Sequence, residues 1–377
     1  MSFDYEVIVV GLGAMGSAAA FHLARSGRSV LGLDKYHPPH NFGSSHGLTR
    51  IIREAYFEDP LYVPLVQRAY ELWADLEKRS NCQLLLKTGG LMIGPPDGAL
   101  VRGASRSAEQ HNLQHEILNS TNLAQKFPMF KVVDDPIAVW EPRAGILFPE
   151  RAIQTHLDFA ARLGAQLSFN DPACKWEPVA NGVRVFTDAN SYTANHLVLS
   201  PGAWMSDLLP QLSLPLTVER QVLYWFKPLS HLELFQPDQF PIFIRQYTSN
   251  RFFYGFPDLG DGVKVAFHHQ GGQVDPDGIS REVKADEVEE MRRVQSEYLP
   301  DANGELLSTA VCMYTNTPDE HFILDYHPKF PQVVLASPCS GHGFKFSPVI
   351  GELIAGMVEG KAPPFNLELF KLCRYSR

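Results

Sequence analysis

The sequence predicts an α/β protein, α+β overall, whose parallel sheet is assembled from distant parts of the chain. Three apolar runs, at residues 5–10, 196–200 and 333–336, are typical of strands buried on both faces in a parallel sheet. Residues 217–275 instead alternate between apolar and polar side chains, as strands with one buried face do. We therefore expect two regions, a discontinuous parallel sheet covered by helices and a second, mixed β-sheet.

The start of the chain forms one complete strand–helix–strand unit. A glycine turn follows the strand at 5–10, and the helix predicted over 14–26 stops at Gly27, a residue suited to ending a helix. The next strand, 29–33, ends at Asp34.

The elements beyond this unit are less regular. A loop rich in Pro, His, Gly and Ser covers 36–49, and the apolar residues that then repeat at helical spacing are Leu65, Ala69, Leu72, Trp73 and Leu76. We expect a mixed region at 86–150, helices at 152–163, 282–299 and 348–359, and a β-ribbon that joins 182–186 to 191–194. The helix at 282–299 is predicted to turn inward Val288, Met291, Val294 and Tyr298.

Composition excludes several classes of protein. The net charge of −9 and the pI near 5.9 argue against a nucleic-acid partner, because phosphate contacts need clustered Lys and Arg. No apolar run reaches the roughly 18 residues of a membrane helix, so we expect no membrane partner. The five cysteines are scattered and suggest no disulfide framework, which favours a cytoplasmic location.

A glycine-rich turn predicts a dinucleotide site. The run Gly11-Leu12-Gly13-Ala14-Met15-Gly16 follows a strand and opens a helix, and Asp34 ends the second strand 23 residues after Gly11. The first glycine makes the turn, the second lets the backbone approach the pyrophosphate, and the third packs helix on strand. The carboxylate takes the ribose hydroxyls, which favours FAD or NAD over NADP. The small residues at the end of the strand at 196–200 are suited to a close approach to the same ligand.

Three further segments carry polar chemistry. Residues 43–47 match the G-x-S-x-G nucleophile elbow of hydrolases. That elbow needs a strand before it and a helix after it, whereas here both neighbouring segments are loops. The small hydroxyls of Ser44 and Ser45 therefore fit phosphate or flavin-ring contacts better. Arg50 and Arg53 flank an apolar pair, and buried arginines usually have anionic partners. The run 341–345, with two glycines and Lys345, places amides and a cation beside a ligand.

Cysteine and histidine are the other residue types that can carry special chemistry. Taken alone, Cys312 reads as a small buried hydrophobic residue. The histidines have no spacing typical of metal ligands, so we expect no metal site.

In this order, the motifs are similar to those of the monomeric sarcosine oxidase and N-methyltryptophan oxidase family, to which peroxisomal sarcosine/pipecolate oxidase is related. The resemblance runs through nearly the whole chain, and its most specific pieces are 43–47, 49–53, 254–257, 312–315, 317–320 and 340–345. It implies a Rossmann-like FAD-binding domain, discontinuous in sequence, plus a mixed β-sheet substrate domain. The FAD-binding domain is expected at 1–85, 150–216 and 326–377, and the substrate domain at 86–149 and 217–325.

The resemblance also implies roles for individual residues. It implies an FAD bound covalently by a thioether at Cys312, and a lysine, Lys264, that promotes the reaction with oxygen. Arg53 and Lys345 match a pair that binds the substrate carboxylate. Tyr254, His268 and Tyr314 match pocket-lining positions, with Phe267 expected to enclose the substrate beside them. The expected cofactor contacts are Gly11, Leu12, Gly13, Met15, Gly16, Asp34, Lys35, Ser44, Ser45, Arg50, Cys312, His342, Gly343 and Lys345.

The function implied is oxidation of a small secondary-amine amino acid by a monomeric flavoprotein, with oxygen as acceptor and an imine and hydrogen peroxide as products. A flavin dehydrogenase that passes electrons to a protein acceptor is the main alternative, followed by an NAD-dependent dehydrogenase and a non-catalytic flavin-binding protein. The sequence departs from the family pattern at Ser45, at Ile244 and at the pair Pro338-Cys339. The loop from Arg245 to Phe253 is also one residue longer than in the family. These departures leave the substrate open among N-methyl and cyclic amino acids.

Overall fold

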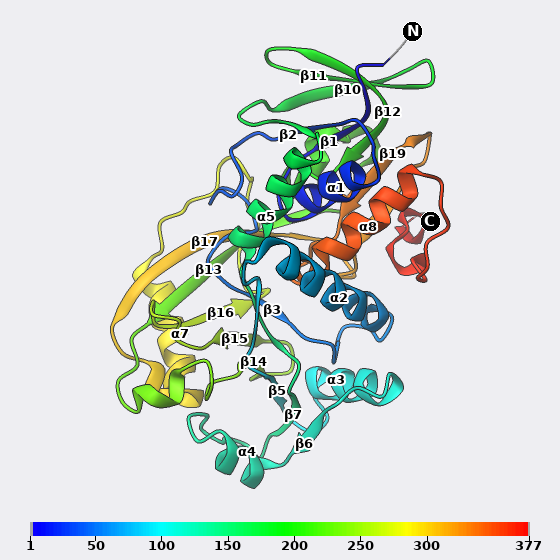
Figure 1. Cartoon of the computed structure of the whole chain (residues 1–377). Coiled ribbons are helices and arrows are strands. Elements are labelled where there is room, and N and C mark those ends of the chain that lie inside the picture. Colours follow the sequence, from blue (N-terminus) through cyan, green and yellow to red (C-terminus); the bar gives the residue numbers. More distant parts are fainter. Residues whose placement is uncertain (1–2, 376–377) are drawn as a thin grey trace.

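Two eight-stranded sheets organise the chain in a computed structural model that describes residues 3–375 (Figure 1). The first sheet has at its centre β1 (Tyr5–Val10), which pairs in parallel with β2 (Val30–Leu33) and with β12 (Ser191–Leu199). Outside them lie β9 (Gln166–Ser168) on β2 and β19 (Phe330–Ser337) on β12, again in parallel. The predicted discontinuous parallel sheet is confirmed.

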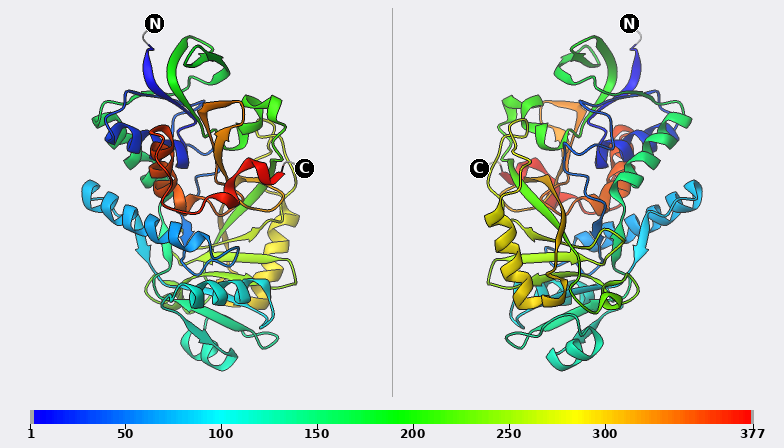
Figure 2. Two further views of the ribbon diagram at one scale, coloured as in Figure 1. Left: turned by 90° about the vertical axis from the view of Figure 1, so that its right-hand side faces the viewer. Right: turned by 90° about the vertical axis from the view of Figure 1, so that its left-hand side faces the viewer.

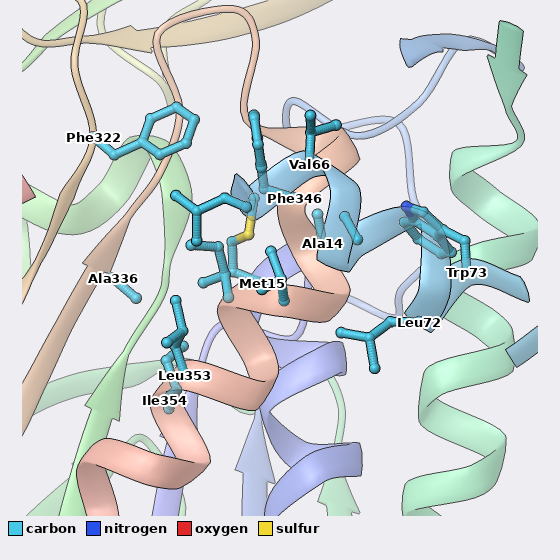
Figure 3. Packing of buried hydrophobic residues seen from close by; sticks show 14 of the residues in the cluster. Ala14, Met15, Val66, Leu72, Trp73, Phe322, Ala336, Phe346, Leu353 and Ile354 are labelled. Atoms are coloured by element: carbon cyan, nitrogen blue, oxygen red, sulfur yellow. The ribbon is translucent and has the colours of Figure 1, made fainter. Parts of the chain in front are cut away.

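Helices cover this sheet where the sequence predicted them. They are α1 (Ala14–Arg25), α5 (Pro149–Arg162) and α8 (Ser347–Val358), and α2 (Tyr62–Ser80) packs against α8. The helix α1 packs against both α5 and α8, and an added Cβ at Gly351 would lie 2.6 Å from the Ala18 backbone, so the two helices are in close contact there. Figure 3 shows Met15 of α1, Trp73 of α2 and Leu353 of α8 in one apolar core.

The edge of the first sheet differs in one respect from the prediction. The ribbon strand and the buried strand expected at 191–194 and 196–200 are one strand, β12. Its first half pairs antiparallel with β11 (Gly182–Thr187), which pairs with β10 (Ala173–Val179), and its second half pairs parallel with β1. Asn195 interrupts the apolar pattern there, but it does not interrupt the backbone pairing on either side.

The second sheet has the order β17-β13-β16-β15-β14-β5-β7-β6 and lies at the other end of the molecule (Figures 1 and 2). Its strands are β5 (Gly90–Gly94), β6 (Glu116–Leu118), β7 (Ile137–Glu141), β13 (Thr217–Phe226), β14 (Ile242–Gln246), β15 (Phe252–Phe256), β16 (Val263–His268) and β17 (Leu306–Asn316). The expected mixed sheet is confirmed, although the eleven-residue strand β17 was not anticipated.

Three helices accompany the second sheet, namely α3 (Ala99–Gln110), α4 (Ser120–Lys126) and α7 (Ala285–Tyr298). The helix α7 begins three residues later than the predicted start at 282. Lys284 is extended, and its backbone N–H donates to the Glu287 carboxylate at 2.8 Å, so the helix begins only after this residue. Met291 and Tyr298 are buried as expected, whereas Val288 and Val294 are half-buried.

A small third sheet, ordered β3-β8-β4, joins β3 (Arg50–Ile52), β4 (Leu85–Lys87) and β8 (Gly145–Leu147). The strand β18 (Ile323–His327) pairs with β19 and so belongs to the first sheet. The domain division remains a prediction. Because β18 belongs to the first sheet, the boundary between the substrate domain and the last segment of the FAD-binding domain fits better before Ile323 than after residue 325.

Candidate active site

A cavity of about 430 Å³ lies between the two large sheets. The carboxyl ends of parallel strands are the usual place for a ligand in an open α/β sheet. Here they contribute Val10, Leu33, Asp34, Ser200 and Ala336. The face of the second sheet contributes Ile244, Tyr254, His268, Cys312 and Tyr314. The cavity therefore brings the predicted dinucleotide site and the predicted substrate residues together.

The three glycines of the turn after β1 have separate roles. Gly11 has a φ of +84°, and an added Cβ would lie 2.5 Å from the Ser200 carbonyl oxygen. At Gly16 an added Cβ would lie 1.7 Å from the Gly11 carbonyl oxygen, so this glycine lets α1 pack on the turn. Gly13 lines the cavity, and no heavy atom of the described chain beyond its own neighbours in sequence lies within 4 Å of the Cβ position. This open face is where a pyrophosphate can approach the backbone.

The end of β2 presents a carboxylate to the cavity. Asp34 accepts hydrogen bonds from the backbone N–H of Leu12 at 2.6 Å and of Tyr36 at 2.8 Å. Burial raises the pKa of Asp34, and these two bonds oppose that shift. The next residue, Lys35, also lines the cavity, and its Nζ lies 2.6 Å from Asp277 Oδ1, a partner that the sequence did not reveal.

The loop before β3 is folded around a guanidinium. Arg50 donates from Nη1 to the Thr49 carbonyl at 2.7 Å and from Nη2 to the Ser44 carbonyl at 2.6 Å. Ser44, Ser45 and Arg50 all line the cavity, as expected.

Lys264 lies behind this loop and is not among the cavity-lining residues, in contrast to most of the predicted site. Its buried Nζ donates to the Gly47 carbonyl at 2.7 Å, to Thr49 Oγ1 at 2.9 Å and to the Thr49 carbonyl at 3.1 Å. Glu150 holds the loop from the other side, because its Oε1 accepts from the backbone N–H of Gly47 at 2.8 Å. Burial lowers the pKa of Lys264 well below its usual value.

One end of the cavity carries an ion pair that the sequence did not identify. Arg53 is 1% exposed, and its Nη2 lies 2.8 Å and 2.7 Å from the two carboxylate oxygens of Glu58. Its Nε is buried without a hydrogen-bond partner among residues 3–375. Burial raises the pKa of Glu58, but the charges of Arg53, His342 and Lys345 and the hydrogen bond from Arg53 together outweigh it, so the net pKa is lowered. The expected anionic partner of a buried arginine is therefore a neighbour five residues away.

Lys345 lies beside this pair. Its Nζ donates to the His342 carbonyl at 2.7 Å and to Tyr56 Oη at 3.3 Å, and the side chain lines the cavity. Burial and the charge of Arg53 lower the pKa of Lys345 to about 7, against the opposing effect of Glu58. This end of the cavity thus holds two cations and one anion.

The His342–Gly343 turn supports this cation. Gly343 has no room for a Cβ, which would lie 1.6 Å from the Pro338 carbonyl oxygen. His342 lines the cavity, but both of its ring nitrogens have partners in the protein.

Side chains from β15, β16 and β17 form the part of the cavity wall that belongs to the second sheet. Tyr314 Oη lies 3.4 Å from Tyr254 Oη and 3.4 Å from His268 Nδ1. Burial lowers the pKa of His268 well below its usual value, which favours the neutral ring. The expectation for Phe267 is wrong, because alternate residues of β16 face opposite sides and Phe267 packs in the apolar cluster beneath the sheet.

Cys312 is buried on β17 and lines the cavity. Burial raises the pKa of its thiol, and the charges of Arg50 and Lys264 oppose this shift. The departures from the family pattern at Ser45, Ile244 and Pro338-Cys339 also line the cavity. These single-residue departures are therefore cavity positions, whereas no residue of the loop from Arg245 to Phe253 lines the cavity.

Two general features complete the description. Within residues 3–375, no three His, Cys, Asp or Glu side chains are grouped so that they could hold a metal ion. No helix in the same range is long and apolar enough to cross a membrane.

Comparisons with known proteins agree with this geometry. The sequence model of the DAO family, described as FAD dependent oxidoreductase, matches residues 6–357. A monomeric sarcosine oxidase from Streptomyces avermitilis is 46% identical over 361 residues, which cover 95% of this chain and 94% of the relative. An N-methyl-L-tryptophan oxidase from Yersinia pestis is 37% identical and covers 99% and 100% of the two chains.

A solved structure of NikD, an amino acid oxidase essential for nikkomycin biosynthesis, has the same fold. It superposes with a TM-score of 0.85 at 23% identity and covers 97% of both chains. The family match extends over most of the chain, and it includes the glycine turn, Asp34 and the helix α8 up to its last residue but one. The chain therefore belongs to the DAO family of FAD-dependent oxidoreductases.

Proposed function

We propose that this enzyme oxidises a small secondary-amine amino acid, such as sarcosine or another N-methyl or cyclic amino acid. The observation that carries the proposal is the pairing, in one cavity, of a cationic end at Arg53 and Lys345 with an aromatic wall at Tyr254, His268 and Tyr314. The names of the relatives from Streptomyces avermitilis and Yersinia pestis support the same substrate class. The overall reaction consumes the amine and O₂ and yields the imine and H₂O₂, and water then hydrolyses the imine.

The residues of the cavity fit FAD. Gly13 leaves open space for a pyrophosphate, Asp34 presents a carboxylate for ribose, and Ser44, Ser45, Arg50 and Cys312 line the same cavity. When bound, FAD takes the two electrons that leave the amine. We further propose that Cys312 Sγ holds the flavin covalently through a thioether, since this buried thiol faces the cavity.

The cationic end would bind and orient the substrate. A carboxylate held by Lys345 and Arg53 gains charge-assisted hydrogen bonds of roughly 1.5–3 kcal/mol each. Because Glu58 already neutralises Arg53, the net positive charge of this end comes from protonated Lys345. With the carboxylate fixed there, the amine points to the wall of Tyr254, His268 and Tyr314, where the neutral His268 leaves the amine uncharged surroundings.

We propose that Lys264 promotes the reaction with oxygen from its place behind the loop at Gly47 and Thr49. The three oxygen acceptors around its Nζ favour an ammonium, while burial disfavours it. Negative charge that develops in the cavity shifts this balance toward the charged form, so the lysine is suited to stabilising a superoxide-like charge.

We also propose that the enzyme acts as a monomer in the cytoplasm. The first part rests on the Streptomyces relative, a monomeric sarcosine oxidase, and the second on the scattered, unpaired cysteines.

The test is anaerobic mixing of the holoenzyme with sarcosine, N-methylalanine, proline and pipecolate while the visible flavin absorbance is followed. We expect at least one of these acids to bleach the flavin at least as fast as the enzyme turns over with that acid in air. Admitting air should then return the absorbance with one H₂O₂ per amine oxidised. Bleaching without peroxide would favour the dehydrogenase alternative, and no bleaching by any of the acids would refute the substrate class.

A further inference from the structure

We propose that Tyr56, a residue outside the cavity, is a positioning residue that acts with His342 and the Glu320 carbonyl to hold Lys345 Nζ against the substrate carboxylate. This inference rests on the proposed function of Lys345. Tyr56 is fully buried and does not line the cavity, so it can act only through a neighbour.

The hydrogen bonds of His342 determine the direction of this chain of contacts. His342 Nε2 lies 2.9 Å from the Glu320 carbonyl oxygen, and a carbonyl can only accept, so Nε2 carries the proton. The other nitrogen, Nδ1, is then an acceptor, and Tyr56 Oη lies 2.6 Å from it. The Tyr56 hydroxyl therefore donates to His342, and its oxygen lone pairs remain to accept from Lys345 Nζ at 3.3 Å.

Lys345 is left with one free donor. Of its three ammonium hydrogens, one is directed to the His342 carbonyl at 2.7 Å and one to Tyr56 Oη. Tyr56 is buried outside the cavity, whereas the Lys345 side chain lines it, so the third hydrogen is available to a ligand. The two contacts thus fix the direction in which the cation is presented.

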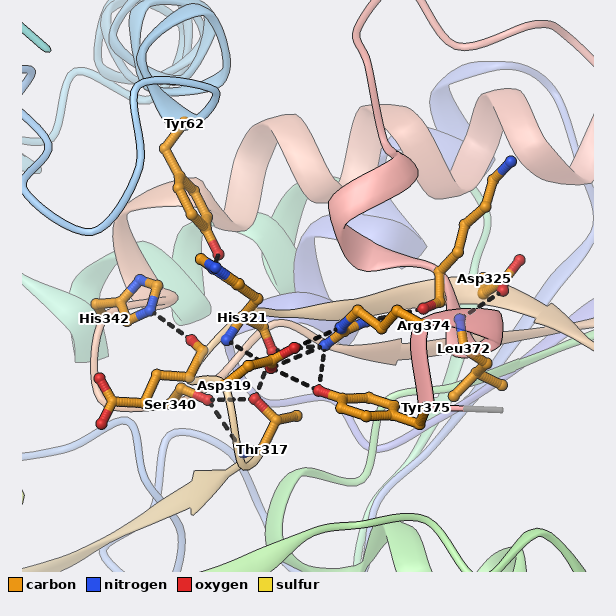
Figure 4. Close-up of polar contacts among 12 residues, drawn as sticks. Tyr62, Thr317, Asp319, His321, Asp325, Ser340, His342, Leu372, Arg374 and Tyr375 are labelled. Carbon is orange, nitrogen blue, oxygen red and sulfur yellow. Dashed lines mark hydrogen bonds and ion pairs between the residues drawn. The ribbon is translucent and has the colours of Figure 1, made fainter. Parts of the chain in front are cut away.

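The turn that supplies the Glu320 carbonyl is itself anchored, as Figure 4 shows. Asp319 accepts from Arg374 Nε at 2.9 Å and from Tyr375 Oη at 2.6 Å, so the end of the chain holds the turn. Tyr62 Oη lies 3.1 Å from His321 Nδ1 in the same turn, and the Tyr62 ring stacks on Tyr56 with centroids 4.7 Å apart.

The charged groups around Lys345, together with its contact to Tyr56, determine the pH at which the lysine loses its proton. The titratable groups that face it are Arg53, Glu58, Tyr56, His342 and His268. Burial lowers the pKa of His342 to about 3, so this ring stays neutral while Lys345, with a pKa of about 7, titrates. The contact with Tyr56 Oη favours the ammonium, and its removal should lower the pH at which Lys345 loses its proton.

The experiment measures the Kd of the oxidised holoenzyme for propionate by the change in flavin absorbance, from about pH 5.5 to about pH 8.5. Propionamide serves as the neutral ligand. For the wild type we expect propionate binding to weaken above pH about 7, approaching tenfold per pH unit. In Tyr56→Phe the weakening should begin about one pH unit lower, which makes binding roughly tenfold weaker on the alkaline side.

Two further variants separate the outcomes. Tyr62→Phe removes the neighbouring stacked hydroxyl, which contacts His321 and not Lys345. Because Arg374 and Tyr375 still hold the turn through Asp319, the pH profile should stay unchanged. Lys345→Arg replaces the titrating cation by a permanent one and should abolish the alkaline weakening, a test that holds even if Tyr56→Phe does not fold. An unshifted profile in Tyr56→Phe, an equal shift in Tyr62→Phe, or alkaline weakening that persists in Lys345→Arg would overturn the inference. Equal binding of propionate and propionamide by the wild type would instead refute the carboxylate site.

Discussion

Adding one methyl group at Gly13 or at Gly16 has opposite expected effects, because the two glycines have different surroundings. At Gly16 the new Cβ would lie 1.7 Å from the Gly11 carbonyl oxygen and 2.7 Å from Ser200 Oγ. Since ordinary contacts begin at 3.4 Å, α1 has to move away from β1 by more than an ångström. Overpacking of this kind costs about 1–3 kcal/mol. Gly16→Ala should therefore lower the Tm of the flavin-free protein by a few degrees.

Gly13→Ala should leave the same flavin-free protein intact. Gly13 has a negative φ of −66° and a ψ of −153°, within about 30° of the extended region open to alanine, and no described atom beyond its own neighbours in the chain lies within 4 Å of the new Cβ. Its stability should match the wild type or rise by up to about 1 kcal/mol. The methyl group projects toward the space that we assign to FAD, and overpacking of about 1–3 kcal/mol there means roughly 5- to 150-fold weaker cofactor binding.

Both variants are best compared on a Cys312→Ser background, so that cofactor binding stays reversible if the thioether exists. Thermal unfolding without FAD measures the packing effect, and titration with FAD measures the effect on binding. The reasoning would be refuted by a Gly13→Ala protein that binds FAD as tightly as its parent. A Gly16→Ala protein with an unchanged Tm would refute the packing argument.

Three other substitutions test single residues of the site. Cys312→Ser should release the flavin into the supernatant on acid precipitation, whereas Cys339→Ser should retain it in the pellet; the reverse pattern would move the attachment to Cys339. Lys264→Met should leave anaerobic flavin reduction largely intact and slow reoxidation by roughly 10²–10³-fold, and equal losses in both steps would point to a structural lysine. Glu58→Gln should lower the free energy of unfolding in urea by about 3–5 kcal/mol, because it leaves the buried Arg53 unpaired. A loss below about 1 kcal/mol would contradict a strong ion pair.

The parts of the fold that the sequence predicted are those that depend on local patterns. The strand–helix–strand unit around Gly11 and the helix α8 follow from apolar periodicity and glycine placement within a few residues. The strand β12 was divided in two because Asn195 breaks the apolar pattern, although the pairing of its neighbours with β11 and β1 continues. Pairing between strands is a non-local property that periodicity does not record.

The same contrast holds in the site. Arg53, Lys345 and Cys312 could be singled out because they stand in short motifs, and all three line the cavity. Asp277 could not be connected with Lys35, since 242 residues separate the two. Glu58 could be found from the sequence, because a buried arginine needs an anion and this carboxylate lies five residues further along.

The placement of Phe267 failed for a geometric reason. It was grouped with Tyr254 and Tyr314 by residue type, but its neighbour His268 occupies the cavity side of β16. Adjacent residues of a strand cannot both face one cavity, so a correctly placed His268 already excluded Phe267.

The central claim is that a cationic end of the cavity holds an amino acid by its carboxylate while the amine is oxidised. The most direct test follows flavin bleaching under anaerobic conditions with the best amino acid found and with its amide, at a pH near 6 where Lys345 is protonated. The account predicts fast, saturable bleaching by the acid and much weaker binding of the amide, with the advantage lost in Arg53→Ala. Equal bleaching by acid and amide, or an unchanged turnover in Arg53→Ala, would contradict it.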